Sequence, residues 1–228
     1  MSLVLINPYS VAAPATIPVD AGLFNWLEAE DAVAGTSTWA DRSSNGYDWT
    51  WDNSNNYSKP ANNQVLWASN NIIRAPSGVY PNCASGGTNG EAELFCRLRA
   101  AGTSRGIWQF SNKNDNGDWY PYGTATDVYI GWGSNLRPYI SVSSATTSWH
   151  TLNVTISGGT WRVFYNGSLE NTQTGRTCNF INQPYIGKMG AAGFYWNGYI
   201  SSLVVYDRAL SDAERATMAA WMDGRELS

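Results

Sequence analysis

The sequence predicts an all-β fold, a two-sheet antiparallel sandwich with one short C-terminal helix. Short segments of alternating apolar and polar residues recur along the chain, and turn-forming Gly, Asn, Asp and Ser residues separate them. One clear helix signal follows near the C-terminal end. A length of 228 residues without an evident linker fits one all-β domain that can bury a sizeable core.

The C-terminal stretch carries the most specific local signals. Residues 199–206 are rich in Ile, Leu, Val and Tyr, which favour a half-buried strand. A helix is expected over 211–223, because Ser211 and Glu214 have the spacing of a capping box. Gly224 can take the left-handed conformation that ends many helices. Apolar residues recur at helical spacing along it: Met218, Trp221 and Met222.

The other elements follow from the same patterns in chain order. Residues 24–31 could form a helical turn or a strand, and residues 52–63, 76–90 and 111–123 are expected to be loops because they are rich in Gly, Asn, Asp, Ser and Pro. Expected strands are 47–51, 64–67, 71–75, 91–99, 106–110, 129–132, 139–142, 149–156, 161–165, 168–172, 177–180 and 185–187.

The N-terminal segment differs in composition from the rest. Residues 1–22 are expected to form an extended arm and residues 23–228 the sandwich domain. The arm contains prolines that disfavour a helix: Pro8, Pro14 and Pro18. It also contains apolar residues, so we expect it to dock either on its own domain or on a neighbouring subunit: Leu3, Leu5 and Ile6.

Motifs in the expected order resemble a known family. Residues 198–214 (GYISSLVVYDRALSDAE) are similar to the closing strand and helix of laminin-G-like domains, which belong to the concanavalin A-like lectin/glucanase jelly rolls. Residues 39–46 (WADRSSNG) resemble the early turn of that family, and residues 149–152 (WHTL) with 161–167 (WRVFYNG) resemble its central hairpin. The resemblance implies a jelly roll over residues 23–224, but says little about function, because one fold hosts many functions.

A second resemblance concerns the start of the chain. Residues 6–9 (INPY), close behind a Met-Ser start, are similar to the opening of small structural proteins of tailed bacteriophages. This implies a virion protein, such as a capsid decoration or tail component. Its expected partners are other virion proteins, held through the N-terminal arm, and further copies of itself in a homo-oligomer.

Composition argues against several classes of partner. The net charge is −4, with 14 Lys plus Arg against 18 Asp plus Glu and no basic run, so nucleic-acid binding is not expected. No apolar run reaches the length of a membrane span. The apolar N-terminal stretch lacks a preceding Lys or Arg, so the usual secretion signal is not expected either.

Cysteine and histidine are sparse. Cys83, Cys96 and Cys178 are an odd set without metal-ligand spacing, so neither a disulfide framework nor a zinc site is expected. Cys96 shares one face of its expected strand with apolar residues, which favours a buried thiol. His150 is the only histidine, and it lies in the segment that the resemblance assigns to the fold, so a structural role is favoured.

The acidic residues do not predict catalysis. Glucanases of the resembled family place acids at period two on one strand, as nucleophile, helper and acid/base. Glu91 and Glu93 have that spacing without a third acid, and Glu28, Glu30 and Asp31 lie near the start of the domain. Both groups are expected to be solvated surface acids, and the protein is not expected to be an enzyme.

The stretch 111–123 offers candidate ligands for calcium and for sugars. Asp115, Asn116 and Asp118 supply closely spaced oxygens around a Gly turn, which could hold Ca²⁺ or could be an ordinary Asx-rich turn. Aromatic rings on loops beside amides and carboxylates suit glycan binding, because a sugar stacks its C–H face on a ring. The candidate rings, which could instead pack on the sheet or on a neighbouring subunit, are Trp119, Tyr120, Tyr122 and Trp132.

The sequence therefore predicts a non-enzymatic virion-surface structural or adhesion protein with a lectin-like domain that could grip host or environmental polysaccharide. A stand-alone carbohydrate-binding module is the first alternative. A glycoside hydrolase is a weaker one, because the acid triplet is missing. No cofactor other than calcium is expected.

Overall fold

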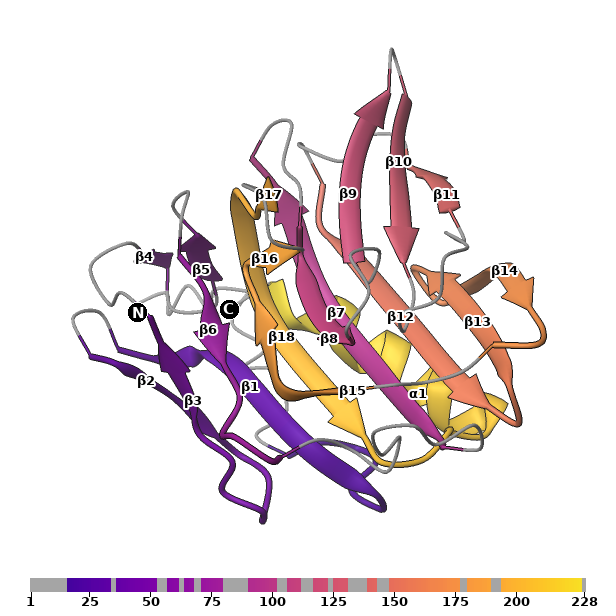
Figure 1. Ribbon diagram of the computed structural model, residues 1–228, viewed down its shortest axis with the longest axis horizontal. Helices are drawn as coiled ribbons and strands as arrows, with labels where there is room; N and C mark the ends of the chain where they lie inside the picture. Colours follow the sequence, from indigo (N-terminus) through magenta and orange to yellow (C-terminus); the bar gives the residue numbers. More distant parts are fainter. Residues whose placement is uncertain are drawn as a thin grey trace, which may run out of the picture.

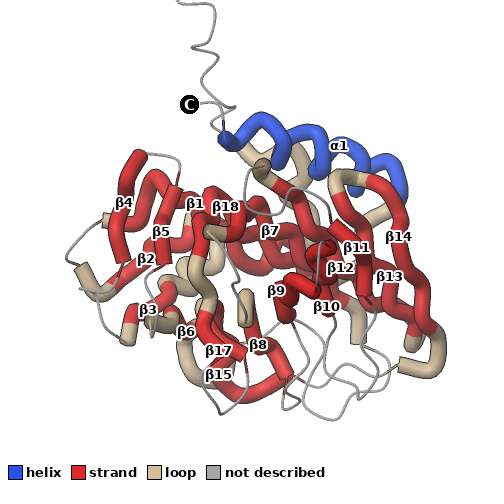
Figure 2. The backbone as a smooth tube through the Cα atoms, turned by 90° about the horizontal axis from the view of Figure 1, so that it is seen from above, coloured by secondary structure: helices blue, strands red, loops and turns tan. Residues whose placement is uncertain are grey.

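The computed structural model describes residues 16–33, 36–52, 57–61, 64–67, 71–79, 90–101, 106–111, 117–122, 125–130, 139–142, 148–176, 180–189 and 194–226. In these ranges the chain forms antiparallel strands and one α-helix, which confirms the predicted sandwich (Figure 1). The strands lie in two layers, and the helix covers the outer side of one layer (Figure 2). No helix within the described ranges is both long and apolar enough to span a bilayer.

The helix-side layer lies directly beneath the helix. Its strands are hydrogen-bonded in the order β1, β18, β7, β12, β13 and β14, and β5, paired with β4, borders β18. Residues 24–31, for which the sequence predicted either a helical turn or a strand, lie in the strand β1. This strand pairs with β18 on one side and with β2 on the other. The bounds of this layer are β1 Leu23–Ala32, β18 Gly198–Tyr206, β7 Ala92–Ala100, β12 His150–Ser157, β13 Thr160–Tyr165, β14 Ser168–Gln173, β4 Tyr57–Ala61 and β5 Gln64–Trp67.

The front layer packs on the other side of the core. It runs β3, β6, β15, β8, β9, β10 and β11, and β2 connects it to β1, so the hydrogen-bonded ladder continues from one layer into the other. A small ladder of β16 Lys188–Met189 and β17 Phe194–Tyr195 follows β15. The remaining bounds are β2 Thr38–Asp41, β3 Trp49–Trp51, β6 Ile73–Arg74, β15 Phe180–Ile186, β8 Trp108–Ser111, β9 Gly117–Tyr122, β10 Ala125–Ile130 and β11 Tyr139–Val142.

The main core fills the space between the layers. Alternate residues of β7 contribute to it, and the predicted inward face is confirmed: Leu94, Cys96 and Leu98. Opposite them the front layer buries large rings and branched side chains: Trp49, Trp51, Ile73, Trp108 and Ile186. Burial of this apolar surface stabilises the sandwich by roughly 25 cal/mol for each Å² removed from water.

A second apolar cluster lies between the helix-side layer and the helix. The outward residues Phe95 and Val204 meet Met218 and Met222 of the helix there. Val19 belongs to the same cluster, and the Tyr206 hydroxyl donates to its carbonyl oxygen at 2.8 Å. The last part of the predicted arm is therefore packed against the domain, while residues 1–15 lie outside the described ranges.

The helix α1, Asp212–Asp223, confirms the predicted capping box of Ser211 and Glu214. The predicted left-handed end at Gly224 is wrong, because its φ is −77°. The chain instead continues into the 3₁₀ helix η2, Gly224–Glu226, which carries Arg225 to a buried carboxylate on the sheet. This continuation brings Arg225 to Glu28 at the place where the left-handed turn was expected.

Two expected loops contain strands. Within 111–123, residues 117–122 form β9 and pair with β10, because Trp and Tyr favour a strand more than the preceding Asn and Asp favour a loop. The expected strand over 129–132 is β10, which begins at Ala125 and ends at Ile130. Within 52–63, β4 includes Pro60, which is tolerated because β4 pairs on one side only, with β5.

Candidate functional site

Three of the four predicted sugar-binding residues lie on the β9–β10 hairpin. Trp119, Tyr120 and Tyr122 belong to β9, and Trp132 lies outside the described residues. β9 pairs with β8 through Gly117 and Trp108, so the hairpin extends the front layer. The structure thus places positions 119, 120 and 122 on one strand of the front layer.

The predicted calcium ligands are only partly covered. Asp118 lies in β9 opposite Tyr129, and Asp115 and Asn116 lie outside the described ranges. Among described residues, no group of His, Cys, Asp and Glu side chains could hold a metal ion. Calcium binding at this loop stays a prediction.

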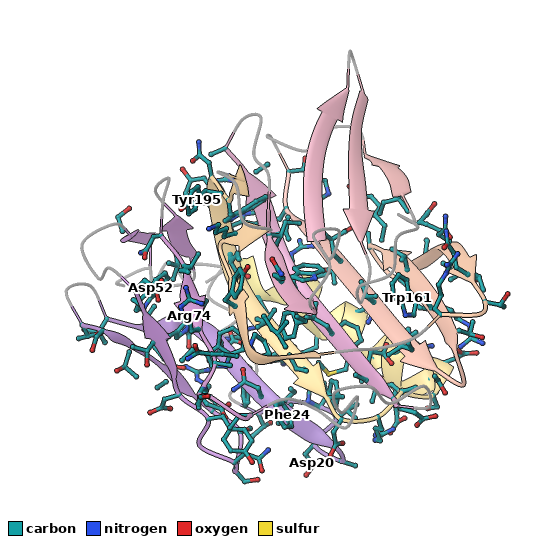
Figure 3. All side chains as sticks on the ribbon, in the orientation of Figure 1. Asp20, Phe24, Asp52, Arg74, Trp161 and Tyr195 are labelled. Atoms are coloured by element: carbon teal, nitrogen blue, oxygen red, sulfur yellow. The ribbon has the colours of Figure 1, made fainter. Side chains whose placement is uncertain are left out.

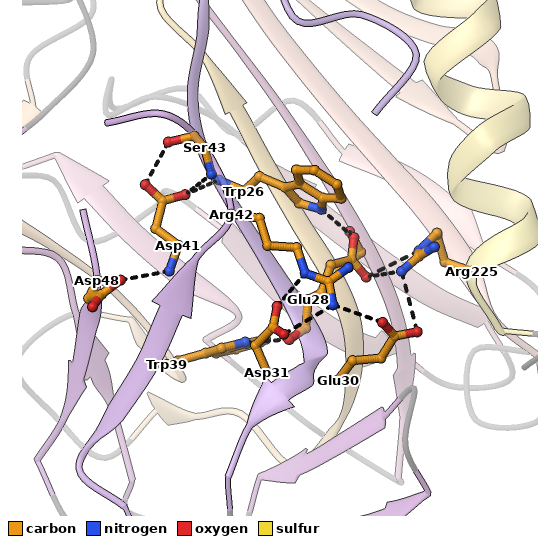
Figure 4. A network of polar contacts seen from close by, with 11 residues as sticks. Trp26, Glu28, Glu30, Asp31, Trp39, Asp41, Arg42, Ser43, Asp48 and Arg225 are labelled. Atoms are coloured by element: carbon orange, nitrogen blue, oxygen red, sulfur yellow. Dashed lines mark hydrogen bonds and ion pairs between the residues drawn. The ribbon is translucent and has the colours of Figure 1, made fainter. Parts of the chain in front are cut away.

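Glu28 corrects the expectation that the early acids are solvated. It is 2% exposed and accepts hydrogen bonds from Trp26 Nε1 at 2.5 Å, Ser202 Oγ at 2.7 Å and Arg225 Nη2 at 2.8 Å (Figure 4). Burial raises the pKa of Glu28, and Arg225 opposes that rise. The carboxylate is buried because β1 is a central strand whose outer face lies under the C-terminal end of α1.

Glu93 was also expected at the surface, and it is fully buried. Arg215 of α1 donates to it from Nε at 2.7 Å and from Nη2 at 3.1 Å. The Leu210 amide and Asn153 Nδ2 donate to it as well, at 2.7 and 2.9 Å. Glu28 and Glu93 thus both anchor the helical segment, while Glu91 is exposed as expected.

The early turn that resembles the family motif is held by one carboxylate. Asp41 accepts hydrogen bonds from the amides of Trp26 and Tyr47 at 2.8 Å, and from the amide and hydroxyl of Ser43 at 2.9 and 2.6 Å. Asn45 donates from Nδ2 to the Phe24 carbonyl at 2.9 Å. The motif therefore builds a turn against β1.

His150 and Cys96 lie inside the domain. His150 is buried and contacts the Tyr165 hydroxyl through Nδ1, and burial raises the pKa of Tyr165 to about 12. Cys96 is a buried free thiol whose pKa burial also raises. These contacts agree with the structural roles expected for both residues.

A row of polar and aromatic side chains crosses the face of the front layer that points away from the core. Their neighbours in sequence, Trp51, Ile73, Trp108 and Ile186, point into the core, so the alternation places the row outside. Arg74 stacks over the ring of Tyr185 at 5.2 Å and donates to Asp52 at 2.7 and 3.0 Å. The Tyr185 hydroxyl donates to Gln109 Oε1 at 2.6 Å.

The β16–β17 ladder extends this row. Lys188 lies 5.2 Å from the centre of the Tyr195 ring. Burial raises the pKa of Tyr185, Arg74 opposes the rise, and Tyr195 is close enough to add to it. We call this set the front platform, and Figure 3 shows three of its members on the ribbon. It consists of Asp52, Arg74, Gln109, Tyr185, Lys188 and Tyr195.

The front platform suits contact with polar, ring-shaped ligands. Tyr185 and Tyr195 are partly exposed rings, and the side chain of Arg74 is 32% exposed. Carboxylate, guanidinium, ammonium and amide groups surround the rings. Sequence reasoning missed this set because Arg74 and Tyr185 meet only through the pairing of β6 with β15.

Residues 82–214 match the family described as the concanavalin A-like lectin/glucanases superfamily, within its laminin-G group. The chain belongs to this family. No curated protein matches the sequence.

Solved structures share the fold at low identity. The binding domain of botulinum neurotoxin DC in complex with rat synaptotagmin II has a TM-score of 0.63 and 13% identity, covering 90% of this chain and 52% of that chain. A structure from botulinum neurotoxin type C, whose cell entry depends on interaction with two ganglioside molecules, has a TM-score of 0.61 and 12% identity, covering 89% and 52%. The chain therefore spans about half of these structures, and the likeness concerns the fold.

Proposed function

We propose that this protein is a non-catalytic carbohydrate-binding domain whose site is the front platform. The observation that carries the proposal is the row formed by Asp52, Arg74, Tyr185 and Gln109 on the outward face of the front layer. Membership of a lectin/glucanase family and the fold likeness to binding domains that recognise receptors support a recognition role.

Recognition at the platform combines stacking with directional hydrogen bonds. A sugar ring places its C–H face on Tyr185 or Tyr195, while its hydroxyl groups pair with Asp52 and Arg74. The ion pair and the cation–π contact fix Arg74 before a ligand arrives, which lowers the entropy cost of binding.

The proposal includes no hydrolysis. Glycosidases flank the scissile bond with a pair of carboxyl groups, one of which donates a proton. The platform's acid, Asp52, is ion-paired to Arg74. Glu28 and Glu93 are engaged with Arg225 and Arg215 on the other layer, which supports binding without turnover.

A finer version of the proposal places this domain on a virion surface, as an adhesion protein anchored by residues 1–15. It rests on the resemblance of residues 6–9 to phage structural proteins. Many copies on one particle would strengthen weak sugar contacts by effective concentration. Deletion of residues 2–15 should leave a folded domain that no longer joins an assembly; a truncated chain that assembles as before contradicts the anchor.

The test of the platform uses immobilised β-glucan and galactan with purified protein. Tyr185→Ala and Tyr195→Ala should each weaken retention by about 0.5–1.5 kcal/mol, as expected for loss of one aromatic contact. Tyr47→Ala is the matched control, because Tyr47 is a partly exposed ring that contacts Phe24 away from the platform. Equal loss in all three variants, or release of reducing ends by the native protein, contradicts the proposal.

A further inference from the structure

A second group of exposed rings lies on the opposite side of the sandwich. Arg99 near the end of β7 faces Tyr199 of β18, and Trp149 directly precedes β12, which pairs with β7 on the other side. The neighbouring residues Leu98 and Ile200 belong to the main core, so these three side chains point outward from the helix-side layer. All three are partly exposed.

The guanidinium of Arg99 lies close to both rings, and we call these three side chains the Arg99 group. Its central carbon lies 4.4 Å from the centre of the Tyr199 ring and 5.3 Å from that of Trp149. The two ring centres are 6.3 Å apart and the ring planes are inclined by 60°. The rings therefore support the cation from two sides, and both cation–π contacts restrict where the guanidinium can lie.

Three other arginines on this face are matched with carboxylates. Arg215 binds Glu93, Arg225 binds Glu28, and Arg97 binds Asp223 at the end of α1. Arg99 lies two residues after Arg97 on the same face of β7, and among the described residues it lacks such a carboxylate partner. In the part of the chain that the structure describes, no hydrogen-bond acceptor or carboxylate is within reach of its N–H groups.

We propose that Arg99, Trp149 and Tyr199 form a second binding site, for a sugar that carries a carboxylate, such as a uronic acid unit of an acidic polysaccharide. The planar guanidinium matches a carboxylate with paired N–H groups. The exposed part of the Trp149 or Tyr199 ring can contact the C–H side of the same sugar. This site is on the layer opposite the front platform, and it stands or falls independently of the function proposed there.

A sugar acid fits these groups better than a bare anion does. A free phosphate or sulfate would use the guanidinium and make no stacking contact with either ring. A neutral sugar would use the rings and leave the guanidinium donors unmatched. A ligand that has both an apolar ring face and a carboxylate can contact the rings and the guanidinium together.

The experiment titrates the full chain with an oligogalacturonate and with its methyl ester, using calorimetry. The methyl ester keeps the sugar rings and removes the negative charge. The native protein should bind the acid and bind the ester at least about tenfold more weakly, the scale of a lost charge-assisted hydrogen bond. Affinity for the acid should also fall with added salt.

Variants of the same face identify the site. Arg99→Gln should weaken binding of the acid by about tenfold or more, and Arg99→Lys should recover only part of it, because lysine keeps the charge without the paired fork. Arg162→Gln is the matched control: it removes the same charge from a partly exposed position on β13 of the same layer. Thermal unfolding of each variant establishes that it is folded. If Arg99→Gln does not fold, Trp149→Phe takes its place in the binding measurement.

Distinct outcomes overturn the inference. Equal binding of acid and ester, or equal loss in Arg99→Gln and Arg162→Gln, means that Arg99 forms no specific carboxylate site. If a polyglutamate peptide binds as tightly as the oligogalacturonate, the Arg99 group is a site for an acidic protein partner instead. If Tyr185→Ala no longer binds the oligogalacturonate and Arg99→Gln still does, the acid binds at the front platform.

Discussion

The charged residues under the helical segment are buried, whereas those of the front platform are partly exposed. On the helix-side layer, Glu28 and Glu93 are buried under the helical segment, and each has an arginine partner and further donors. On the front layer, Asp52 and Arg74 pair in a partly exposed row beside Tyr185. The first arrangement can only hold the helix in place, whereas the second leaves groups in contact with solvent and available to a ligand.

The buried and the exposed ion pairs also differ in how much stability is lost when one partner is removed. Two buried charges that satisfy each other contribute little net stability, but removing one partner leaves the other uncompensated inside the protein. An exposed pair is hydrated with or without its partner, so its loss costs little. Changes at the buried pairs of Glu28 and Glu93 should therefore alter stability, and changes in the front platform should alter binding.

The largest effect should come from Glu93. Glu93→Ala leaves the guanidinium of Arg215 buried without its carboxylate and should lower the free energy of unfolding by about 3–5 kcal/mol. Urea denaturation measures it. The double variant Glu93→Leu with Arg215→Met should lose much less, because both charges are gone. A loss below about 1 kcal/mol for Glu93→Ala would mean that this pair behaves like a surface pair and would break the comparison.

Ser211 should have a smaller effect on the same helix. Its hydroxyl accepts the Glu214 amide in the capping box, so Ser211→Ala should lower the free energy of unfolding by about 1 kcal/mol. Ser211→Gly should cost only a few tenths, because glycine suits the N-cap position. Equal losses in the two variants would assign the effect to something other than the cap.

Acid should weaken this helix start over a defined interval. The Arg208 guanidinium, which donates to Glu214 at 2.6 Å, holds the pKa of that carboxyl at about 2, below its ordinary value of 4.5. Because the folded pKa is the lower one, the contribution is fully present above pH 4.5 and is lost as the pH falls toward 2. Glu214→Gln should flatten the dependence of stability on pH in this interval, which thermal unfolding measures; an unchanged slope contradicts it.

The smallest stability effect should come from the front platform. Arg74→Ala removes an exposed ion pair and should lower the free energy of unfolding by about 0.2–1 kcal/mol. The difference from native protein should shrink near 1 M salt, where the Debye length is about 3 Å. The same variant should weaken retention on β-glucan or galactan. A large stability loss with unchanged retention would make Arg74 a structural residue.

Much of the fold could be predicted because its signals are local. Composition at 199–206 and alternation at 91–99 predicted the strands β18 and β7, and the spacing of Ser211 and Glu214 located the helix start. The errors fell where local signals compete: Trp and Tyr against Asn and Asp in 111–123, and glycine against an ion pair at position 224.

The candidate site could not be read in the same way. The surface assignment of Glu28 and Glu93 relied on the average behaviour of acids, which holds only when no buried partner exists. Their partners, Arg225 and Arg215, lie at the far end of the sequence and reach them only after the helix docks.

The sequence by itself determined the class of fold, the position of the helix and its cap, and the buried state of Cys96. Each depends on period, propensity or spacing among neighbouring residues, which are fixed before the chain folds. Only the tertiary structure decided which acids are buried and which aromatic rings share a surface with cations. The pairing of β6 with β15, and of β7 with β12 and β18, brings Arg74 to Tyr185 and Arg99 to its two rings. Strand neighbours of this kind are set by the packing of the whole chain, and so both proposed binding surfaces emerge only from the folded sandwich.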